Sequence, residues 1–197
     1  MKIQLGAHPF YEPDAQVLVD YQVQPYDYYM IMARFEPENN LDMVLQGIDQ
    51  DPNNTTPILV VGNHQTKYGA YLKNKYAANP LIRFQGGKYN ILHLNSLRYH
   101  AKLYFHGHSV GGTNPSLLEA MASQALIAAH DNDFNRSILQ DNAYYFSQAN
   151  DVTQLIQRLD RSQEADKIAA NLKAIENEFN WERINGAYLQ LLESSIT

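Results

Sequence analysis

The sequence contains no cysteine, which excludes a disulfide framework and any thiolate metal site. It has no apolar run of the roughly 20 residues that a membrane-spanning helix needs. The opening MKIQLGAHPFYEPD lacks the apolar middle of a signal peptide. Histidine paired with a second histidine or a carboxylate at zinc-like spacing is also missing. We therefore expect a soluble, cytoplasmic chain with no metal ion and no transmembrane segment, and association of a longer protein with the inner face of the membrane stays open.

Basic residues are few and scattered. The chain has 15 Lys and Arg against 21 Asp and Glu, which gives a formal net charge of -6. Binding of a polyanion needs clustered Lys and Arg that contact phosphates, and no such cluster is present. We expect no nucleic-acid partner.

Three familiar catalytic or phosphate-binding motifs are absent. The pattern GxGxxG follows none of the predicted strands, no P-loop ends in Lys and Ser or Thr, and there is no serine nucleophile elbow. A standard dinucleotide site, a P-loop nucleotide site and a serine hydrolase site are therefore not predicted.

Short apolar runs alternate with segments of helical periodicity. This pattern predicts an α/β protein with a Rossmann-like, doubly wound parallel sheet and helices on both faces. The strands are expected within 28–35, 57–62, 81–86, 101–106 and 126–129, with a short sixth at 144–146. The helices between them are expected at 41–49, 67–78, 90–99 and 115–123.

The two ends of the chain differ from this middle part. Residues 1–27 carry three prolines and are interpreted as an interdomain connector. Residues 28–180 form the predicted domain, which two amphipathic helices near 152–159 and 168–179 complete. Residues 181–197 are expected to form a helix that packs on this domain or crosses back to another one.

In an open parallel sheet, ligands bind outside the carboxyl ends of the strands, so the loops after Phe35, Gly62, Gly86 and His106 are candidate binding loops. The last of them reads HGHSVGGTNPS and leads into the helix LLEAMA. Its paired glycines allow close approach of a ligand, Asn114 is suited to cap the helix, and the NH groups that follow form a predicted anion site. The alternative is a turn followed by a well-capped helix.

Four side chains near this loop are candidates for ligand contacts. Glu119 could accept hydrogen bonds from a diol such as a ribose, or it could be a solvated residue of the first helical turn. Arg34 could bind phosphate with two hydrogen bonds, or it could form a surface ion pair with Glu36 or Glu38. For His106 and His108, donation of a hydrogen bond to a ligand is more plausible than metal binding.

The order of ARFEPENN, PILVVGNH, LIRFQGG and HGHSVGGTNPSLLEAMASQALIAAHDN resembles the C-terminal, nucleotide-sugar-binding half of GT-B glycosyltransferases of the retaining family 4. The branch annotated with rhamnosyltransferases of polysaccharide assembly is the most similar. The resemblance covers nearly the whole chain from about Tyr28 on. It implies a domain that binds the nucleoside diphosphate of an activated sugar, with transfer of the sugar at retained configuration and without a metal ion or other cofactor.

The resemblance also implies roles for individual residues. Glu119 matches the second Glu of the family's E-x7-E motif, which holds the ribose, and Arg34 matches the Arg that neutralises the leaving diphosphate. The remaining candidates, expected to border the substrate, are Asn39, Gly86, His108, Gly111, Gly112, Thr113, Asn114 and Ser116.

Two positions depart from the family pattern. The first Glu of the motif falls on Gly111, and the Lys that accompanies the family's Arg falls on Asn39. His108 could replace the former and loop NH groups the latter.

The leading hypothesis is the donor-binding half of a glycosyltransferase, with Arg34 and Glu119 in the catalytic site and rhamnose as one candidate sugar. The expected partners are a nucleotide-sugar donor, a glycan or lipid-linked acceptor, and a missing N-terminal GT-B domain. One rival is a noncatalytic nucleotide or sugar-phosphate binding module. Another is a doubly wound regulatory domain that binds no nucleotide. The sequence does not name the base, the sugar, the acceptor or the linkage.

Overall fold

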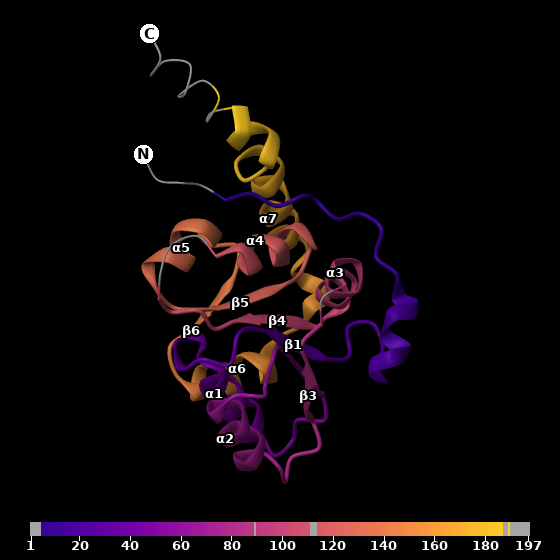
Figure 1. Ribbon diagram of the computed structural model, residues 1–197, viewed down its shortest axis with the longest axis vertical. Helices are drawn as coiled ribbons and strands as arrows, with labels where there is room; N and C mark the ends of the chain where they lie inside the picture. The colour runs from indigo at the N-terminus through magenta and orange to yellow at the C-terminus, as the bar shows by residue number, and fades with distance from the viewer. Residues whose placement is uncertain (1–4, 89, 111–113, 187–188, 190–197) are drawn as a thin grey trace.

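The computed structural model describes residues 5–88, 90–110, 114–186 and 189. Its centre is a sheet of six strands that pair in parallel, in the order β3-β2-β1-β4-β5-β6 (Figure 1). The strands are β1 Tyr29–Met32, β2 Ile58–Val61, β3 Ile82–Gly86, β4 Leu103–His106, β5 Ile127–His130 and β6 Tyr144–Phe146. All six lie where the apolar runs predict them, so the Rossmann-like fold class is confirmed.

Helices cover both faces of the sheet, as Figure 1 shows. One face carries α1 Leu41–Asp49, α2 Lys67–Lys75 and α6 Ala149–Arg158. The other carries α3 Ile91–His100, α4 Pro115–Ala122, α5 Asp133–Leu139 and α7 Ala165–Asn177. Short 3-10 helices lie at η1 Ala15–Tyr21, η2 Pro37–Asn39 and η3 Arg161–Gln163.

The central strands are buried on both faces. On β1, Met30 packs into one hydrophobic cluster and Ile31 into the cluster on the opposite side, and both side chains are completely buried. Successive residues of a strand point to opposite faces, so a strand covered on both sides must be apolar throughout. Each such side chain contributes about 1.5–3 kcal/mol through burial. These clusters fix the sheet, whose carboxyl edge carries the site.

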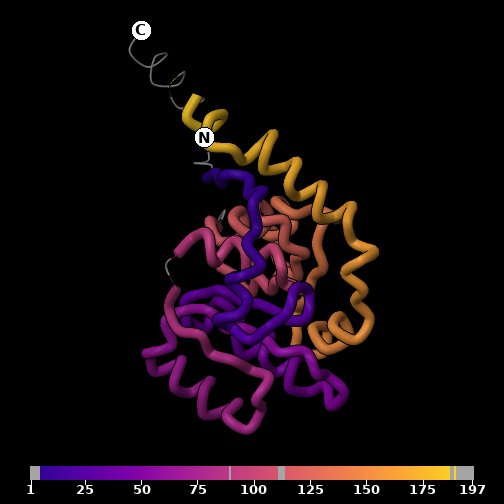
Figure 2. The backbone as a smooth tube through the Cα atoms, turned by 90° about the vertical axis from the view of Figure 1, so that its right-hand side faces the viewer, coloured from indigo at the N-terminus to yellow at the C-terminus, as the bar shows by residue number. Residues whose placement is uncertain are grey.

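The described part of the N-terminal segment packs on the domain. Val17 and Leu18 of η1 are buried in the cluster beside α3, and the Phe10 amide donates to the Ala122 carbonyl at 3.0 Å. The Ala7 amide donates to the Phe179 carbonyl at 2.9 Å, which joins this segment to the chain just after α7. Figure 2 shows the start of the described N-terminal segment beside the chain that follows α7. The role of residues 1–27 as a connector to a further domain stays a prediction.

Helix α5 is not predicted from the sequence. It has seven residues, and its one apolar pair at helical spacing, Phe134 and Ile138, is too short a pattern to indicate a helix. Residues 181–186 are helical, as predicted for the start of the C-terminal helix, and most of the rest of that segment lies outside the described residues. No helix within the described ranges has the length and apolar character needed to cross a bilayer.

Candidate functional site

A cavity of about 630 Å³ opens at the carboxyl edge of the sheet. The loops after β1, β2, β3 and β4 border it, together with the start of α4. Strands β2 and β3 follow β1 on one side of the sheet, and β4, β5 and β6 continue it on the other side, so the strand order reverses between β1 and β4. The cavity lies at this reversal, where ligands bind in open parallel sheets. Its volume is in the range of small-molecule sites.

The structure brings most of the predicted site residues to this cavity. Those lining it are Arg34, Asn39, His108, Asn114, Ser116 and Glu119. Gly111, Gly112 and Thr113 lie outside the described residues. Gly86 ends β3 with φ +71°, a conformation that favours glycine, but the following Gly87 and Lys88 line the cavity in its place. Lys88 was not predicted from the sequence.

Asn114 caps α4 as expected. Its side-chain oxygen accepts from the Ser116 amide at 2.9 Å and from the Ser116 hydroxyl at 2.8 Å, and Pro115 occupies the first helical position. The expectation of free NH groups after Asn114 therefore needs correction at Ser116, because the cap already uses that NH. The partial positive charge of the helix N-terminus still lies at the cavity wall.

Arg34 follows β1, and its side chain is exposed at the cavity. The alternative was a surface ion pair, but within the described ranges Arg34 forms none with Glu36 or Glu38. A guanidinium at such a place can donate two hydrogen bonds to a phosphate.

Asn39 is buried and joins the two loops that carry Arg34 and His108. Its amide nitrogen donates to the Arg34 carbonyl at 2.9 Å, and its amide oxygen lies 2.9 Å from Nδ1 of His108. The sequence resemblance expects a lysine at this position, whereas Asn39 holds the two loops together.

Further contacts between the same two loops fix their spacing. The side-chain amide of Asn40 donates to the Gly107 carbonyl at 2.7 Å. The backbone NH of Ser109 donates to the Glu38 carbonyl at 3.0 Å. A Cβ on Gly107 would lie 2.0 Å from the Asn39 carbonyl oxygen, so only glycine allows this approach.

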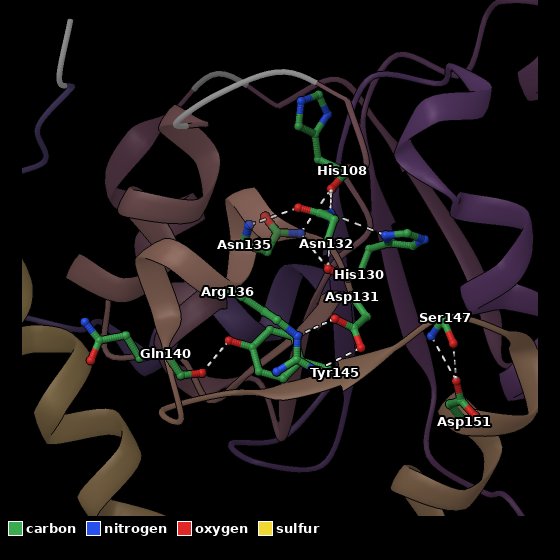
Figure 3. Close-up of polar contacts among 10 residues, drawn as sticks. All are labelled: His108, His130, Asp131, Asn132, Asn135, Arg136, Gln140, Tyr145, Ser147 and Asp151. Atoms are coloured by element: carbon green, nitrogen blue, oxygen red, sulfur yellow. Dashed lines mark hydrogen bonds and ion pairs between the residues drawn. The ribbon is translucent and has the colours of Figure 1, made fainter. Parts of the chain in front are cut away.

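Two asparagines at the start of α5 hold the His108 backbone from the other side (Figure 3). Asn132 and Asn135 both donate to the His108 carbonyl at 3.1 Å, and both also bind the His130 carbonyl. The unpredicted helix α5 therefore contributes to the position of His108.

Burial sets the charge of the two histidines in this loop. Burial, together with smaller contributions from the charges of His108 and Arg98, lowers the pKa of His106 to about 3. Burial also lowers the pKa of His108, as does the charge of Arg34, whereas Glu38 and a hydrogen bond with the Val110 backbone raise it. Both rings are therefore neutral near pH 7, and each neutral imidazole has one donor and one acceptor nitrogen.

Glu119 is neither a freely solvated residue nor an isolated ligand contact. Its Oε2 accepts from Nη2 of Arg98 at 2.6 Å, and its side chain remains 37% exposed at the cavity wall. Sequence reasoning missed Arg98. The available signal was that Arg98 follows Leu94 by four residues and so lies on the apolar stripe of α3, where a charged residue needs a partner.

Metal ligands are not grouped in the part of the chain that the structure describes. No three His, Asp or Glu side chains there are arranged to hold an ion. Catalysis without a metal ion stays a prediction.

Several solved structures share this fold. Sucrose-phosphate synthase from Thermosynechococcus elongatus superposes with a TM-score of 0.79 at 19% identity, over 98% of this chain and 52% of that one. Anabaena HepE in complex with UDP-glucose gives a TM-score of 0.79 at 16% identity, over 91% and 52%. The chain thus spans about half the length of these proteins.

A separately solved C-terminal domain matches over nearly its whole length. This domain, from a glycosyl transferase group 1 family protein of Francisella tularensis, gives a TM-score of 0.71 at 14% identity, over 88% of this chain and 96% of that one. No curated protein sequence matches the chain. Residues 23–180 match the family described as "Glycosyl transferases group 1", and the chain belongs to this family.

Proposed function

We propose that this chain is the donor-binding domain of a glycosyltransferase that takes a nucleoside-diphosphate sugar. The observation that carries the proposal is that Arg34, the N-terminus of α4 and Glu119 line one cavity. A cation and a helix N-terminus suit a diphosphate, and a carboxylate suits the hydroxyls of a pentose.

Each group has a distinct task in this proposal. Arg34 and the positive end of α4 stabilise the charge that develops on the departing diphosphate, which is the expected main catalytic contribution. Glu119 accepts a hydrogen bond from the pentose. His108, neutral and held by Asn39, presents its Nε2 to a hydroxyl of the sugar, at the place where the family pattern has a glutamate.

Transfer of the sugar to an acceptor needs a second domain that forms the other side of the binding cleft. In this proposal the acceptor binds to that further domain; the chain spans about half the length of the solved structures that it matches. Transfer with retention of configuration, rhamnose as the sugar and a polysaccharide acceptor rest on the sequence resemblance, and are proposed for the longer protein in the cytoplasm or at the inner face of the membrane.

Calorimetric titration of this chain with UDP, GDP and dTDP tests the proposal. We expect one of them to bind, and to bind equally in the presence of a chelator. Absence of binding by every nucleoside diphosphate would contradict the proposed function. Loss of binding with the chelator would contradict only its metal-free form.

A noncatalytic nucleotide-binding module is the second candidate. It is favoured by Asn39, which replaces a phosphate-binding lysine and is committed to two hydrogen bonds between loops. Sugar transfer by the longer protein separates the candidates, because a module without chemistry would bind the donor without turnover.

A further inference from the structure

Arg98 is a buried cation directly behind the cavity wall. Its side chain is completely buried, and its Nη1 donates to Oδ1 of Asn95 at 2.8 Å. Its Nη2 lies 3.3 Å from the Met32 sulfur and donates to Oε2 of Glu119 at 2.6 Å. A guanidinium removed from water needs an opposite charge. Among the described residues, Glu119 is the one carboxylate that forms an ion pair with it.

This ion pair divides the two oxygens of Glu119 between different tasks. Oε2 is bound to Arg98 in the protein interior, and no hydrogen bond joins Oε1 to any described residue. The carboxylate is part of the cavity wall and is 37% exposed, so Oε1 is the oxygen available to a ligand. Arg98 also fixes the orientation of the carboxylate, because its own position is set by contacts with Asn95 and Met32.

We propose that Arg98 is the positioning residue of the pentose subsite, and that it makes Glu119 read one pentose hydroxyl instead of the vicinal pair. A carboxylate with two available oxygens can accept from the 2′ and 3′ hydroxyls side by side, one at each oxygen. The two lone pairs of a single oxygen diverge, whereas vicinal hydroxyls approach from nearly the same direction, so one available oxygen accepts a well-aligned hydrogen bond from one of them. The subsite then takes nucleotides of 2′-deoxyribose or 3′-deoxyribose, according to which hydroxyl is read, about as well as ribonucleotides. This inference rests on the proposed function.

The test compares three ligands that share a base. The chain is titrated in a calorimeter with UDP, 2′-deoxy-UDP and 3′-deoxy-UDP, or with the same guanosine set if GDP binds more tightly. We expect one deoxy form to bind within about threefold of the ribonucleotide. The other should bind about tenfold more weakly, because a hydrogen bond to a charged group is lost.

The possible results distinguish a failure of the pentose-subsite inference from a failure of the proposed function. Equal weakening of both deoxy forms would mean that the vicinal pair is read, and would overturn the inference while leaving nucleotide binding intact. Equal affinity for all three ligands would overturn it as well, since no hydroxyl would then be read. Absence of binding by every nucleoside diphosphate would instead overturn the proposed function itself.

Two variants examine Arg98 directly. In Arg98→Met the hydrogen bond to Oε2 is lost and both oxygens become available, so we expect the difference in affinity between the two deoxy forms to fall below about threefold. Arg98→Lys keeps the charge and should retain part of that difference. It replaces Arg98→Met as the test variant if Arg98→Met does not fold. Arg136→Met is the matched control, because Arg136 pairs with Asp131 outside the cavity. An unchanged difference in affinity in folded Arg98→Met would contradict the positioning role. A purely structural role of Arg98 would change the stability of the protein and leave this difference as it is.

Discussion

Nδ1 of His108 lies 2.9 Å from the side-chain oxygen of Asn39. The amide nitrogen of Asn39 is engaged by the Arg34 carbonyl, so the amide oxygen faces the ring and the ring hydrogen resides on Nδ1. Nε2 is then the acceptor nitrogen. The side-chain amide of Asn39 thereby holds two loops of the cavity together and determines which ring nitrogen of His108 carries the hydrogen.

Replacing Asn39 by aspartate should raise the pKa of His108. A carboxylate beside Nδ1 favours the charged ring, and such a neighbour shifts a pKa by about one unit or more. An NMR titration of the His108 ring measures the change. Asn39→Ala is the control, because it removes the hydrogen bond without adding charge. Identical His108 pKa values in the two variants would contradict this role of residue 39.

Arg34→Ala should weaken binding of nucleoside diphosphates about tenfold, which corresponds to the loss of one charge-assisted hydrogen bond of about 1.5 kcal/mol. Affinity for the nucleoside without phosphates should not change, because Arg34 is proposed to contact the diphosphate alone. Calorimetry with both ligands measures the effect. Lys173→Ala removes an exposed cation of α7 outside the cavity and is the matched control. Equal weakening of nucleoside and diphosphate would show that Arg34 has a different task.

The sheet was predictable because its central strands are apolar on both sides. The run around Met30 and Ile31 contains no polar alternation, and only a strand covered on two faces requires that pattern. Helix α1 was predicted with its observed bounds, Leu41–Asp49, because its buried residues recur at helical spacing. Helix α5 was not, because its residues are mostly polar and tertiary contacts hold it in place.

The site was predictable where one loop carries it, and not where distant residues meet. The dipeptide Asn114-Pro115 is a local sequence signal for the N-cap of α4. The pairing of Arg98 with Glu119 joins two helices, and no local spacing encodes their distance. The use of the Ser116 amide by the Asn114 side chain follows from the cap itself, because an N-cap side chain accepts from the second or third NH of its helix, so a free NH at Ser116 was not to be expected.

Gly107→Ala should destabilise the protein and disturb the cavity. The added Cβ would lie 2.0 Å from the Asn39 carbonyl oxygen, so the loops after β1 and β4 must separate. Such overpacking costs about 1–3 kcal/mol, which denaturant unfolding measures.

Gly186→Ala is the matched control for this substitution. A Cβ there meets no atom of the described residues within 4 Å, and alanine is favoured over glycine in a helix by about 0.5–1 kcal/mol. The control should therefore be at least as stable as the original protein. Equal unfolding free energies for the two variants would contradict the close contact at Gly107.

The last prediction concerns acid stability. His106 has a pKa of about 3 in the folded protein because of its burial, against about 6.5 in the unfolded chain. Below pH 6.5 the unfolded state binds the proton and the folded state does not, so the free energy of unfolding falls as the pH falls.

Between pH 7 and pH 5 this residue alone should remove about 2 kcal/mol of stability. The pKa values of His64, His100, His108 and His130 are also lowered by burial and act in the same direction, so the effect of His106 must be measured as a difference. His106→Leu keeps an apolar side chain in this buried place without a titrating group. Denaturant unfolding of both proteins at pH 7, 6 and 5 should give a shallower loss for the variant, by about 2 kcal/mol over the range. Parallel losses in the two proteins would mean that His106 takes up its proton without unfolding, and that the cavity floor is more accessible to water than its packing indicates.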